Sequence, residues 1–315
     1  MHTYAAFGTR LNSTIELPEL VGAVGAAPHA WTLRVAENSS SLGGDLLGTE
    51  VVYGSILVRL LAQDGVLCLA FDDTGTFEVR PDERTITWYP GARRDGDAVR
   101  ADILGRVLAV AVHAEGGLAL HASAVSIGGR AIAFLGPKHA GKSTMAMSLV
   151  RQGARLLTDD MLGLRFDDRG VVQATPGVQR VRLWEDSSRV LHTSAASASG
   201  TKSTIDALPS HEVEGSDVPL DACYVLQPVG SAYAAVVRRD ALTGTQAALS
   251  VVAFSKLGAL LGGTESGVVL DRAARLARTT AFYVASVPRD LHQLDDVGNE
   301  FMRWHRGAAS AGGGP

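Results

Sequence analysis

The sequence predicts an α/β domain that is preceded by a small β-rich domain. Two observations predict this fold. Short alternating runs separated by turn residues fill much of the first third of the chain, and from residue 118 the order changes to strand, glycine-containing loop, helix and strand. A length of 315 residues, 46% of them hydrophobic and 20% charged, suffices for one large globular domain or two ordinary ones.

Charge and composition exclude several classes of protein. A formal net charge of −4 without a cluster of lysine and arginine gives no basic patch, so we expect no nucleic-acid partner. The longest run without charged residues, Ala222–Val237, is interrupted by glutamine, proline and glycine, so we expect no membrane span. Met1–Tyr4 lacks a secretory-signal pattern, and Cys68 and Cys223 have no metal-ligand pattern beside them. These features predict a soluble, cytoplasmic protein with two buried thiols.

The β-rich domain is expected in residues 1–115. Its predicted strands are Ser55–Gln63, Val66–Phe71, Phe77–Arg80 and Thr85–Tyr89. The dipeptide Asp64-Gly65 between the first two strands is a strong hairpin signal. Apolar residues then recur at helical spacing from Val99 to Val110, and Gly116-Gly117 ends this helix and gives the domain boundary.

The α/β domain is expected in residues 116–306, followed by a flexible tail in 307–315. Its first predicted elements are the strands Leu118–Ile127 and Arg130–Leu135, the helix Lys142–Gln152 and the strand Ala154–Thr158, an order typical of a β-α-β core. Further helices are predicted at Trp184–Leu191, Gln246–Leu261, Ser266–Arg278 and Asp290–Trp304, and strands at Ala222–Leu226, Ala234–Val237 and Ala281–Val287. The Ser-, Ala- and Gly-rich segment His192–Lys202 predicts a flexible loop.

The sharpest motif follows the predicted strand that ends at Leu135. The run Gly136-Pro137-Lys138-His139-Ala140-Gly141-Lys142-Ser143 matches the pattern G-x-x-x-x-G-K-[ST] in full, and Thr144 continues it into the helix. Phosphate binding needs a strand before and a helix after such a loop, because the N–H groups of the helix N-terminus face the anion. Lys142, expected to be an exposed charge at the end of the loop, would bind the β- and γ-phosphates of ATP, and the Ser143 hydroxyl would bind Mg²⁺.

Two aspartates, Asp159 and Asp160, follow the next predicted strand. In a parallel α/β arrangement this strand end lies beside the phosphate loop. One carboxylate can hold Mg²⁺ while the other accepts the proton of an attacking hydroxyl, and the sequence leaves these two roles open, although we select Ser143 and Asp160 as the metal ligands. Alternation along the strand predicts that Asp159 faces the interior with Leu157 and that Asp160 faces the opposite side. The alternative is an ordinary solvated turn.

The run Gly136–Asp160 resembles the core of the HPr kinase/phosphorylase family, in which a phosphate loop with GKS leads into a helix ending L-V-x-x-G and a strand ending in two aspartates. The segment Leu120–Ser123 also resembles that family's histidine-bearing strand, and the resemblance extends over about residues 118–297. It implies a P-loop kinase core of the HPr kinase type. The glycine-rich signature that follows the aspartates in the family is replaced here by Pro176–Trp184, and residues 1–115 do not show the family's N-terminal domain.

A narrower resemblance comes from outside the loop. Tyr4–Gly8 with Leu17–Leu20, and Pro176-Gly177 before Arg182–Trp184, are closer to the HPr-kinase-like proteins associated with lasso peptide gene clusters. This resemblance implies phosphorylation of a serine at the C-terminus of a precursor peptide.

Four other residues are candidates for chemistry. His121 lies in an apolar strand and is either a core histidine or, by resemblance, a residue that orients a catalytic carboxylate. Arg180 and Arg182 alternate with apolar residues, so either could clamp the transferring phosphoryl group, with Arg182 our choice. Lys202, in the predicted flexible loop, could close over nucleotide.

Together these features predict an ATP- and Mg²⁺-dependent kinase that phosphorylates the serine hydroxyl of a peptide or protein. We assign catalysis to Asp159, Asp160, Lys142, His121 and Arg182, and expect residues 1–115 to bind the acceptor. A small-molecule kinase, for example of free serine, and a non-catalytic protein that responds to ATP are the alternatives. The sequence leaves the oligomeric state open.

Overall fold

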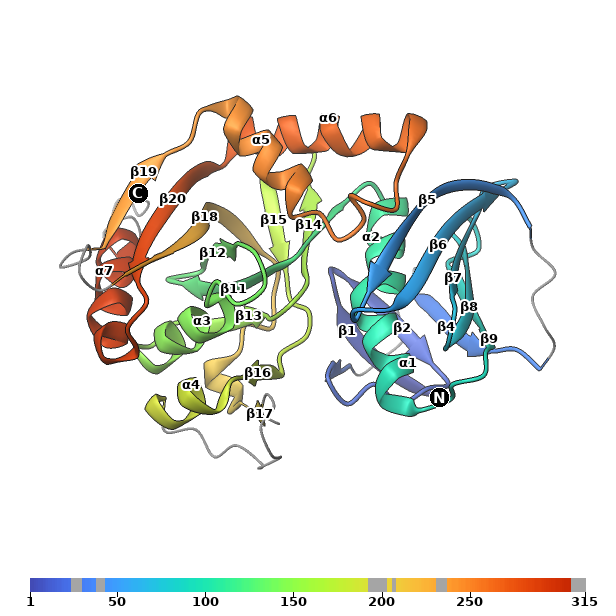
Figure 1. Cartoon of the computed structure of the whole chain (residues 1–315), viewed down its shortest axis with the longest axis horizontal. Helices are drawn as coiled ribbons and strands as arrows, with labels where there is room; N and C mark the ends of the chain where they lie inside the picture. Colours follow the sequence, from blue (N-terminus) through green and yellow to red (C-terminus); the bar gives the residue numbers. More distant parts are fainter. Residues whose placement is uncertain (24–29, 38–42, 192–202, 206–207, 231–236, 307–315) are drawn as a thin grey trace.

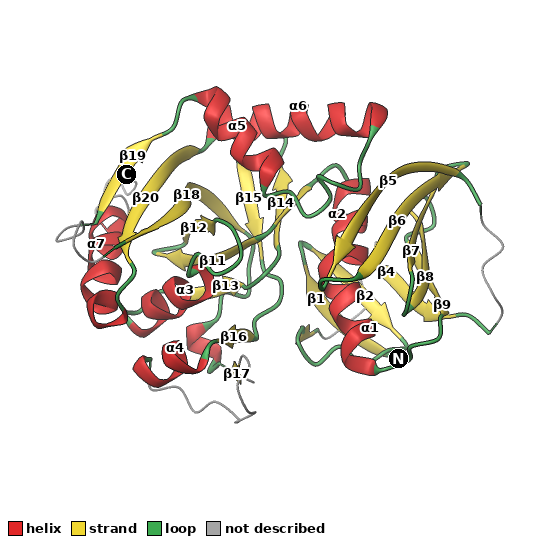
Figure 2. Ribbon diagram, in the orientation of Figure 1, coloured by secondary structure: helices red, strands yellow, loops and turns green. Residues whose placement is uncertain are grey.

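The computed structural model describes residues 1–23, 30–37, 43–191, 203–205, 208–230 and 237–306 (Figure 1). Within this part, the chain forms two large mixed sheets with helices between and beside them (Figure 2). No helix in the described ranges is long and apolar enough to cross a membrane.

The first sheet is built from residues 2–90. Its strands are β1 (His2–Ala6), β2 (Thr9–Ser13), β3 (Val21–Gly22), β4 (Trp31–Val35), β5 (Asp45–Val52), β6 (Ile56–Gln63), β7 (Val66–Phe71), β8 (Gly75–Arg80) and β9 (Thr85–Pro90). Their order is β3-β1-β2-β4-β9-β8-β7-β6-β5, and the neighbours are antiparallel except for the parallel pairs β2–β4 and β4–β9. Strand β5 is therefore an edge of this sheet.

One interrupted helix packs against the first sheet. It consists of α1 (Gly96–Asp102), the π-helical turn η1 (Ile103–Val107) and α2 (Leu108–Ala114). The Asp95 side chain caps its start by accepting a hydrogen bond from the Asp97 backbone. Val99, Ile103 and Val107 are fully buried, as their helical spacing predicts.

The second sheet holds the remaining long strands. In spatial order they are β10 (Leu118–Leu120), β14 (Leu162–Phe166), β15 (Val172–Thr175), β18 (Val218–Val229), β12 (Arg130–Leu135), β11 (Ala122–Ile127) and β13 (Arg155–Thr158), with β20 (Ala281–Pro288) and β19 (Arg238–Ala241) continuing from β18. Strands β12, β18 and β20 are parallel. Strand β11 lies between β12 and β13 and is antiparallel to both, so β12 and β13 end at the same edge.

Helices cover the second sheet on two sides. Helix α3 (Lys142–Arg151) packs beside α7 (Leu294–Arg306) over a cluster in which the Phe301 ring meets Phe134 and Tyr224 edge to face, at 5.3 and 4.9 Å. Helices α5 (Gly244–Ala253) and α6 (Gly263–Thr279) lie on the other side (Figure 1). Shorter elements are β16 (Val181–Leu183), α4 (Glu185–Val190), β17 (Ser203–Ile205), η2 (Ser210–Glu212) and η4 (Leu291–Gln293).

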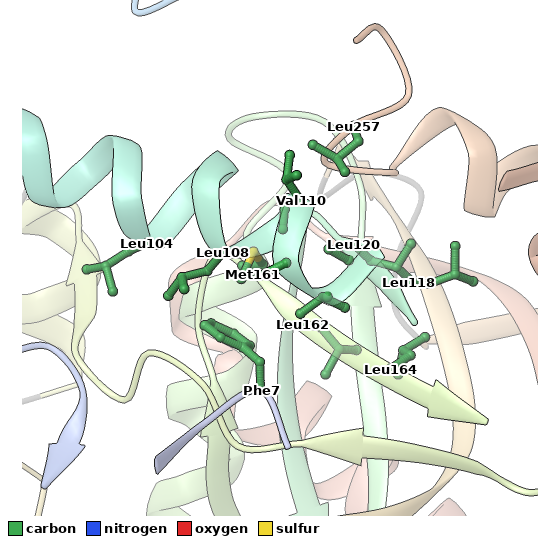
Figure 3. Packing of buried hydrophobic residues seen from close by; sticks show 14 of the residues in the cluster. Phe7, Leu104, Leu108, Val110, Leu118, Leu120, Met161, Leu162, Leu164 and Leu257 are labelled. Carbon is green, nitrogen blue, oxygen red and sulfur yellow. The ribbon is translucent and has the colours of Figure 1, made fainter. Parts of the chain in front are cut away.

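A continuous hydrophobic core joins the two sheets. It extends from the first sheet through α1, η1 and α2 to β10, β14 and α5. Figure 3 shows Phe7 of the β1–β2 turn beside Leu108 and Leu162, which come from the helix and from the second sheet. The domain boundary at residue 116 stays a prediction. Apolar side chains from both sides of this boundary pack in one hydrophobic core.

Most predicted elements are confirmed to within a few residues, and two differ. The predicted strand Leu118–Ile127 is two strands, because the chain changes partners at His121: β10 pairs with β14, and β11 pairs with β12 and β13. The predicted helix Gln246–Leu261 ends at Ala253 and continues in turns. The sequence prediction lacks several strands, among them β1, β2 and β3 of the first sheet and β14, β15 and β19 of the second. Most of the predicted strand Ala234–Val237, the loop His192–Lys202 and the tail 307–315 lie outside the described residues.

Candidate functional site

The phosphate-loop motif forms a turn between β12 and α3. Gly136 and Gly141 have φ of +150° and +91°, angles that favour glycine. A Cβ on Gly136 would also lie 2.9 Å from the Ala140 side chain. Helix α3 begins at Lys142, so its unpaired N–H groups face the loop. The loop thus has the strand, the glycines and the helix N-terminus that a phosphate site requires.

Lys142 differs from the expectation that it is exposed: only 7% of the residue is accessible. Its ammonium group donates hydrogen bonds to the carbonyl oxygens of Gly136 and Pro137, at 2.9 and 3.1 Å. The turn leaves carbonyl groups that need donors, and the lysine supplies them. The cation is therefore held across the loop.

The other residues of the motif point in different directions. Pro137, Lys138 and His139 are exposed, whereas Ala140 is buried. The His139 ring lies 5.2 Å from the Trp184 ring. The Thr144 hydroxyl donates to the Ser187 hydroxyl of α4 at 3.2 Å, so it is directed toward α4.

Asp159 lies in the interior, beside the start of α3. It is 5% exposed, and its Oδ1 accepts hydrogen bonds from the hydroxyls of Ser143, at 2.9 Å, and Ser123, at 2.5 Å. Burial raises the pKa of this carboxyl, and the neighbouring Asp160 charge adds to the rise, against the effect of the serine hydroxyls. The loop serine and the first aspartate are thus in direct contact.

Asp160 points the other way, into an exposed position, and its backbone has a φ of +67°, which is unusual for a residue with a side chain. The Lys256 ammonium lies 2.7 Å from Asp160 Oδ2, and His121 Nδ1 lies 3.2 Å from Oδ1. Desolvation by the surrounding protein raises the pKa of the Asp160 carboxyl, but Lys256 and His121 outweigh it and hold this pKa well below its usual range. Asp160 is an ionised carboxylate paired with a cation.

His121 and Lys256 are brought together by main-chain pairing. The His121 N–H donates to the Phe254 carbonyl at 2.7 Å, and the Lys256 N–H donates to the Ala119 carbonyl at 2.9 Å. The chain at the break between β10 and β11 therefore lies antiparallel to the segment that follows α5. Both side chains converge on Asp160 from this short pairing.

The first sheet supports the chain behind Asp159. The Asp159 N–H donates to the Val178 carbonyl at 2.8 Å, and the preceding Gly177 is covered by the Phe7 ring so closely that a Cβ there would lie 2.4 Å from it. The Phe7 N–H also donates to the Pro176 carbonyl at 2.7 Å. The β1–β2 turn thus packs directly against the segment that positions Asp159.

The structure therefore brings together Lys142, Ser143, Asp159, Asp160 and His121 from the predicted set. Arg182 is exposed on β16 and Arg180 is half-buried, while Lys202 lies outside the described residues.

Sequence reasoning missed Lys256 and Ser123. A signal for Lys256 exists, because only four of the 29 lysines and arginines are lysines, two of those lie in the phosphate loop, and Lys256 follows an apolar run. Its proximity to Asp160 depends on the fold.

The residues present fit a bound Mg²⁺ and nucleotide phosphates. The left-handed backbone of Gly136 and Gly141 turns the loop around the head of α3, and a hydroxyl and a carboxylate, the oxygen donors that Mg²⁺ prefers, meet there. The described residues contain no group of three or more His, Cys, Asp or Glu side chains that could hold a metal by themselves. A cation here would therefore take part of its coordination from phosphate oxygens and water.

Comparisons with known proteins add little to this geometry. No protein-family model matches the chain, and no curated protein matches it. Among solved structures, the Hpr(Ser) kinase/phosphatase from Coxiella burnetii is similar over 61% of this chain and 98% of that chain, with 14% identity and a TM-score of 0.31. This likeness is too weak to carry an inference about function.

Proposed function

We propose that the chain is a cytoplasmic, ATP- and Mg²⁺-dependent kinase that transfers the γ-phosphoryl group to the serine hydroxyl of a peptide or protein. The observation that carries the proposal is the contact between Ser143, at the head of the phosphate-loop helix, and Asp159, with the cation-paired Asp160 next to it. If the loop matched the motif by chance, we would not expect its serine to contact an aspartate at the end of β13, nor the next aspartate to be paired with a lysine. The sequence resemblance adds lasso precursor peptides as a candidate acceptor class.

In this proposal Lys142 and the N–H groups of α3 bind the phosphates. Ser143 and Asp159 face the metal position, so Asp159 takes the role that the sequence alone assigns to Asp160. Bound Mg²⁺ would neutralise charge on the β- and γ-phosphates. Because phosphoryl transfer depends mainly on positioning and charge neutralisation, these residues suffice for the nucleotide side of the site.

Asp160 serves the acceptor side. Its carboxylate is exposed, is held in place by Lys256 and His121, and can accept a hydrogen bond from an incoming serine hydroxyl. A carboxylate with a depressed pKa is a weak base, so Asp160 mainly orients the hydroxyl and takes its proton as the phosphoryl group arrives. Arg182, exposed on β16, is the proposed cationic clamp.

The test is a transfer assay with ATP and Mg²⁺ on a library of heptapeptides that carry their one serine at the centre or at the C-terminus, with matched alanine peptides and free L-serine beside them. Mass spectrometry should find phosphate on serine peptides and on none of the alanine peptides. Lys142→Met should lower turnover at least about 100-fold and weaken ATP binding, because the loop loses its cation. A thermal melt of the variant checks folding, since Lys142 also donates to the loop carbonyls.

Other results would contradict this function. Phosphorylation of free serine alone would indicate a small-molecule kinase, and ATP binding without any transfer would indicate an ATP-responsive binding protein. Wild-type turnover and ATP affinity in Lys142→Met would remove the phosphate-loop assignment.

A further inference from the structure

Three hairpin turns of the first sheet share one backbone geometry. Phe7-Gly8, Tyr53-Gly54 and Asp64-Gly65 each place two successive residues at positive φ, with φ of +52° and +76°, +50° and +87°, and +50° and +78°. Turns of this kind favour Asn or Asp at the first position, as Asp64 shows. Phe7 and Tyr53 are large aromatic residues in a strained position, so each needs a separate reason.

The reason for Phe7 is visible. Its ring is 3% exposed and covers Gly177 of the second part of the chain, as described above. The aromatic residue at this turn is thus explained by its packing against Gly177.

No such surface receives Tyr53 within the described residues, and 65% of this residue is exposed. Its electrostatic neighbours come from two sides: Asp102 and Arg106 of the interrupted helix, and Asp160 and Arg182 of the α/β part. Desolvation and the charges of Asp102 and Asp160 raise the pKa of Tyr53 to about 12. In Figure 1 the β5–β6 turn is on the side of the first sheet that faces the α/β part. Tyr53 therefore faces the acceptor side of the candidate site.

The surroundings of this turn are fixed and polar. Arg106, on the π-helical turn η1, binds Glu50 of β5 through two hydrogen bonds of 2.9 and 2.7 Å, so the hairpin is held against the helix. Asp102 is 3% exposed, and its Oδ2 accepts from the Thr74 hydroxyl at 2.6 Å. Its Oδ1 has no hydrogen-bond partner among the described residues. A buried acceptor without a donor calls for one, and π-helical turns occur frequently at functional sites.

The edge of β5 leads to Tyr53. At its middle, β5 is approached by the loop that follows Lys256, since a Cβ on Gly48 would lie 2.6 Å from the Leu260 carbonyl oxygen. Beyond Gly48 no strand of the described chain pairs with this edge, and Thr49 and Val51 are exposed. The open half of β5 therefore connects the Lys256 loop with Tyr53, and its main-chain groups can pair with an extended chain.

We propose that the acceptor is an extended peptide that pairs with the open edge of β5, residues 49–53, and packs against the Tyr53 ring, with its serine directed to Asp160. This inference rests on the proposed function and names the substrate class of the same site. Free serine and other small hydroxyl compounds lack the main chain and the neighbouring side chains that this edge would bind.

The experiment uses the serine heptapeptide with the highest rate in the library described above. Tyr53→Asn gives the turn its favoured residue, so the variant should fold with an unchanged or higher melting temperature. We expect its KM for the heptapeptide to rise at least about tenfold, while the Kd for ATP stays within about twofold of wild type. Asp64→Asn, at the β6–β7 turn of the same geometry, keeps a favoured residue at that turn, is the matched control and should leave both constants unchanged.

A second measurement tests the main-chain pairing. Heptapeptides with single N-methyl groups should lose activity at alternate positions, because every second N–H of an extended peptide faces the strand that it joins.

The outcomes separate the two proposals. An unchanged peptide KM in Tyr53→Asn, or equal tolerance of N-methyl groups at all positions, overturns the β5 site while the kinase function stands. Absence of transfer by the wild-type protein to every peptide and to serine removes the kinase function, and the β5 site falls with it.

Discussion

Asp159 and Asp160 are neighbours in the chain but lie in opposite surroundings. The first is buried between two serine hydroxyls, with no cation among its described hydrogen-bond partners, and burial raises its pKa. The second is exposed and paired with Lys256 and His121, and its pKa is depressed. The left-handed backbone of Asp160 turns the second side chain away from the first. Two identical residues can thus hold one metal-facing and one acceptor-facing role.

Among substitutions that test this difference, Asp160→Asn should have the largest effect on turnover. The amide keeps the size of the side chain but cannot accept the serine proton, so turnover should fall about 10²–10⁴-fold with little change in ATP affinity. Asp168→Asn, at an exposed turn, is the control. Equal turnover in both variants would place Asp160 outside the chemistry.

Removing the cation beside Asp160 should have the next largest effect. Lys256→Gln loses a charge-assisted hydrogen bond that orients the carboxylate. Turnover should therefore fall about 10- to 100-fold. Lys256→Arg should restore part of this rate because it keeps the charge. The assay is the initial rate at saturating ATP, and an arginine variant as slow as the glutamine variant would argue against a role for the charge.

Asp159→Asn should act on metal use and stability. An amide is a weaker partner for Mg²⁺ than a carboxylate, so the Mg²⁺ concentration for half-maximal rate should rise by several-fold. Because the pKa of Asp159 is raised in the folded state, the wild-type protein loses stability from this group as pH increases, and the loss is absent below about pH 4, the ordinary aspartate pKa. The melting temperature of the variant should therefore equal that of wild type at pH 4 and be equal or higher at pH 8. A variant that needs no more Mg²⁺ than wild type would contradict the assignment.

The smallest effect is expected for His121→Asn. Lys256 still holds Asp160, so turnover should fall only by a few-fold, and the melting temperature should change little because His121 is partly exposed. A loss as large as that of Asp160→Asn would show that His121 takes part in the reaction directly.

Local patterns predicted the arrangement of the phosphate-loop motif and the two aspartates better than the surroundings of Asp160. The loop from Gly136 to Ser143 is contiguous, and the aspartates follow it after one helix and one strand, so spacing alone places them. The burial of Lys142 was missed because it depends on carbonyl groups that only the folded loop exposes. Lys256 lies 96 residues from Asp160 in the chain, and only pairing between distant segments brings the two together.

In the fold, too, local patterns predicted regular elements but not the pairing of distant segments. The strands between Ser55 and Pro90 alternate regularly and are joined by short turns, so they were predictable. The strand 118–127 was predicted as continuous because its sequence stays apolar through the position where the chain exchanges one set of partners for another.

The Phe7 turn has a consequence for how the two parts can be exchanged. Its ring occupies the space above Gly177, directly behind the backbone that holds Asp159. A first sheet transplanted from another protein would leave that space empty or overfilled unless its turn carried a ring of the same size. A chimaera would therefore have to keep Phe7 and Gly177 as a pair, because a first sheet with a different turn would shift the segment that holds Asp159.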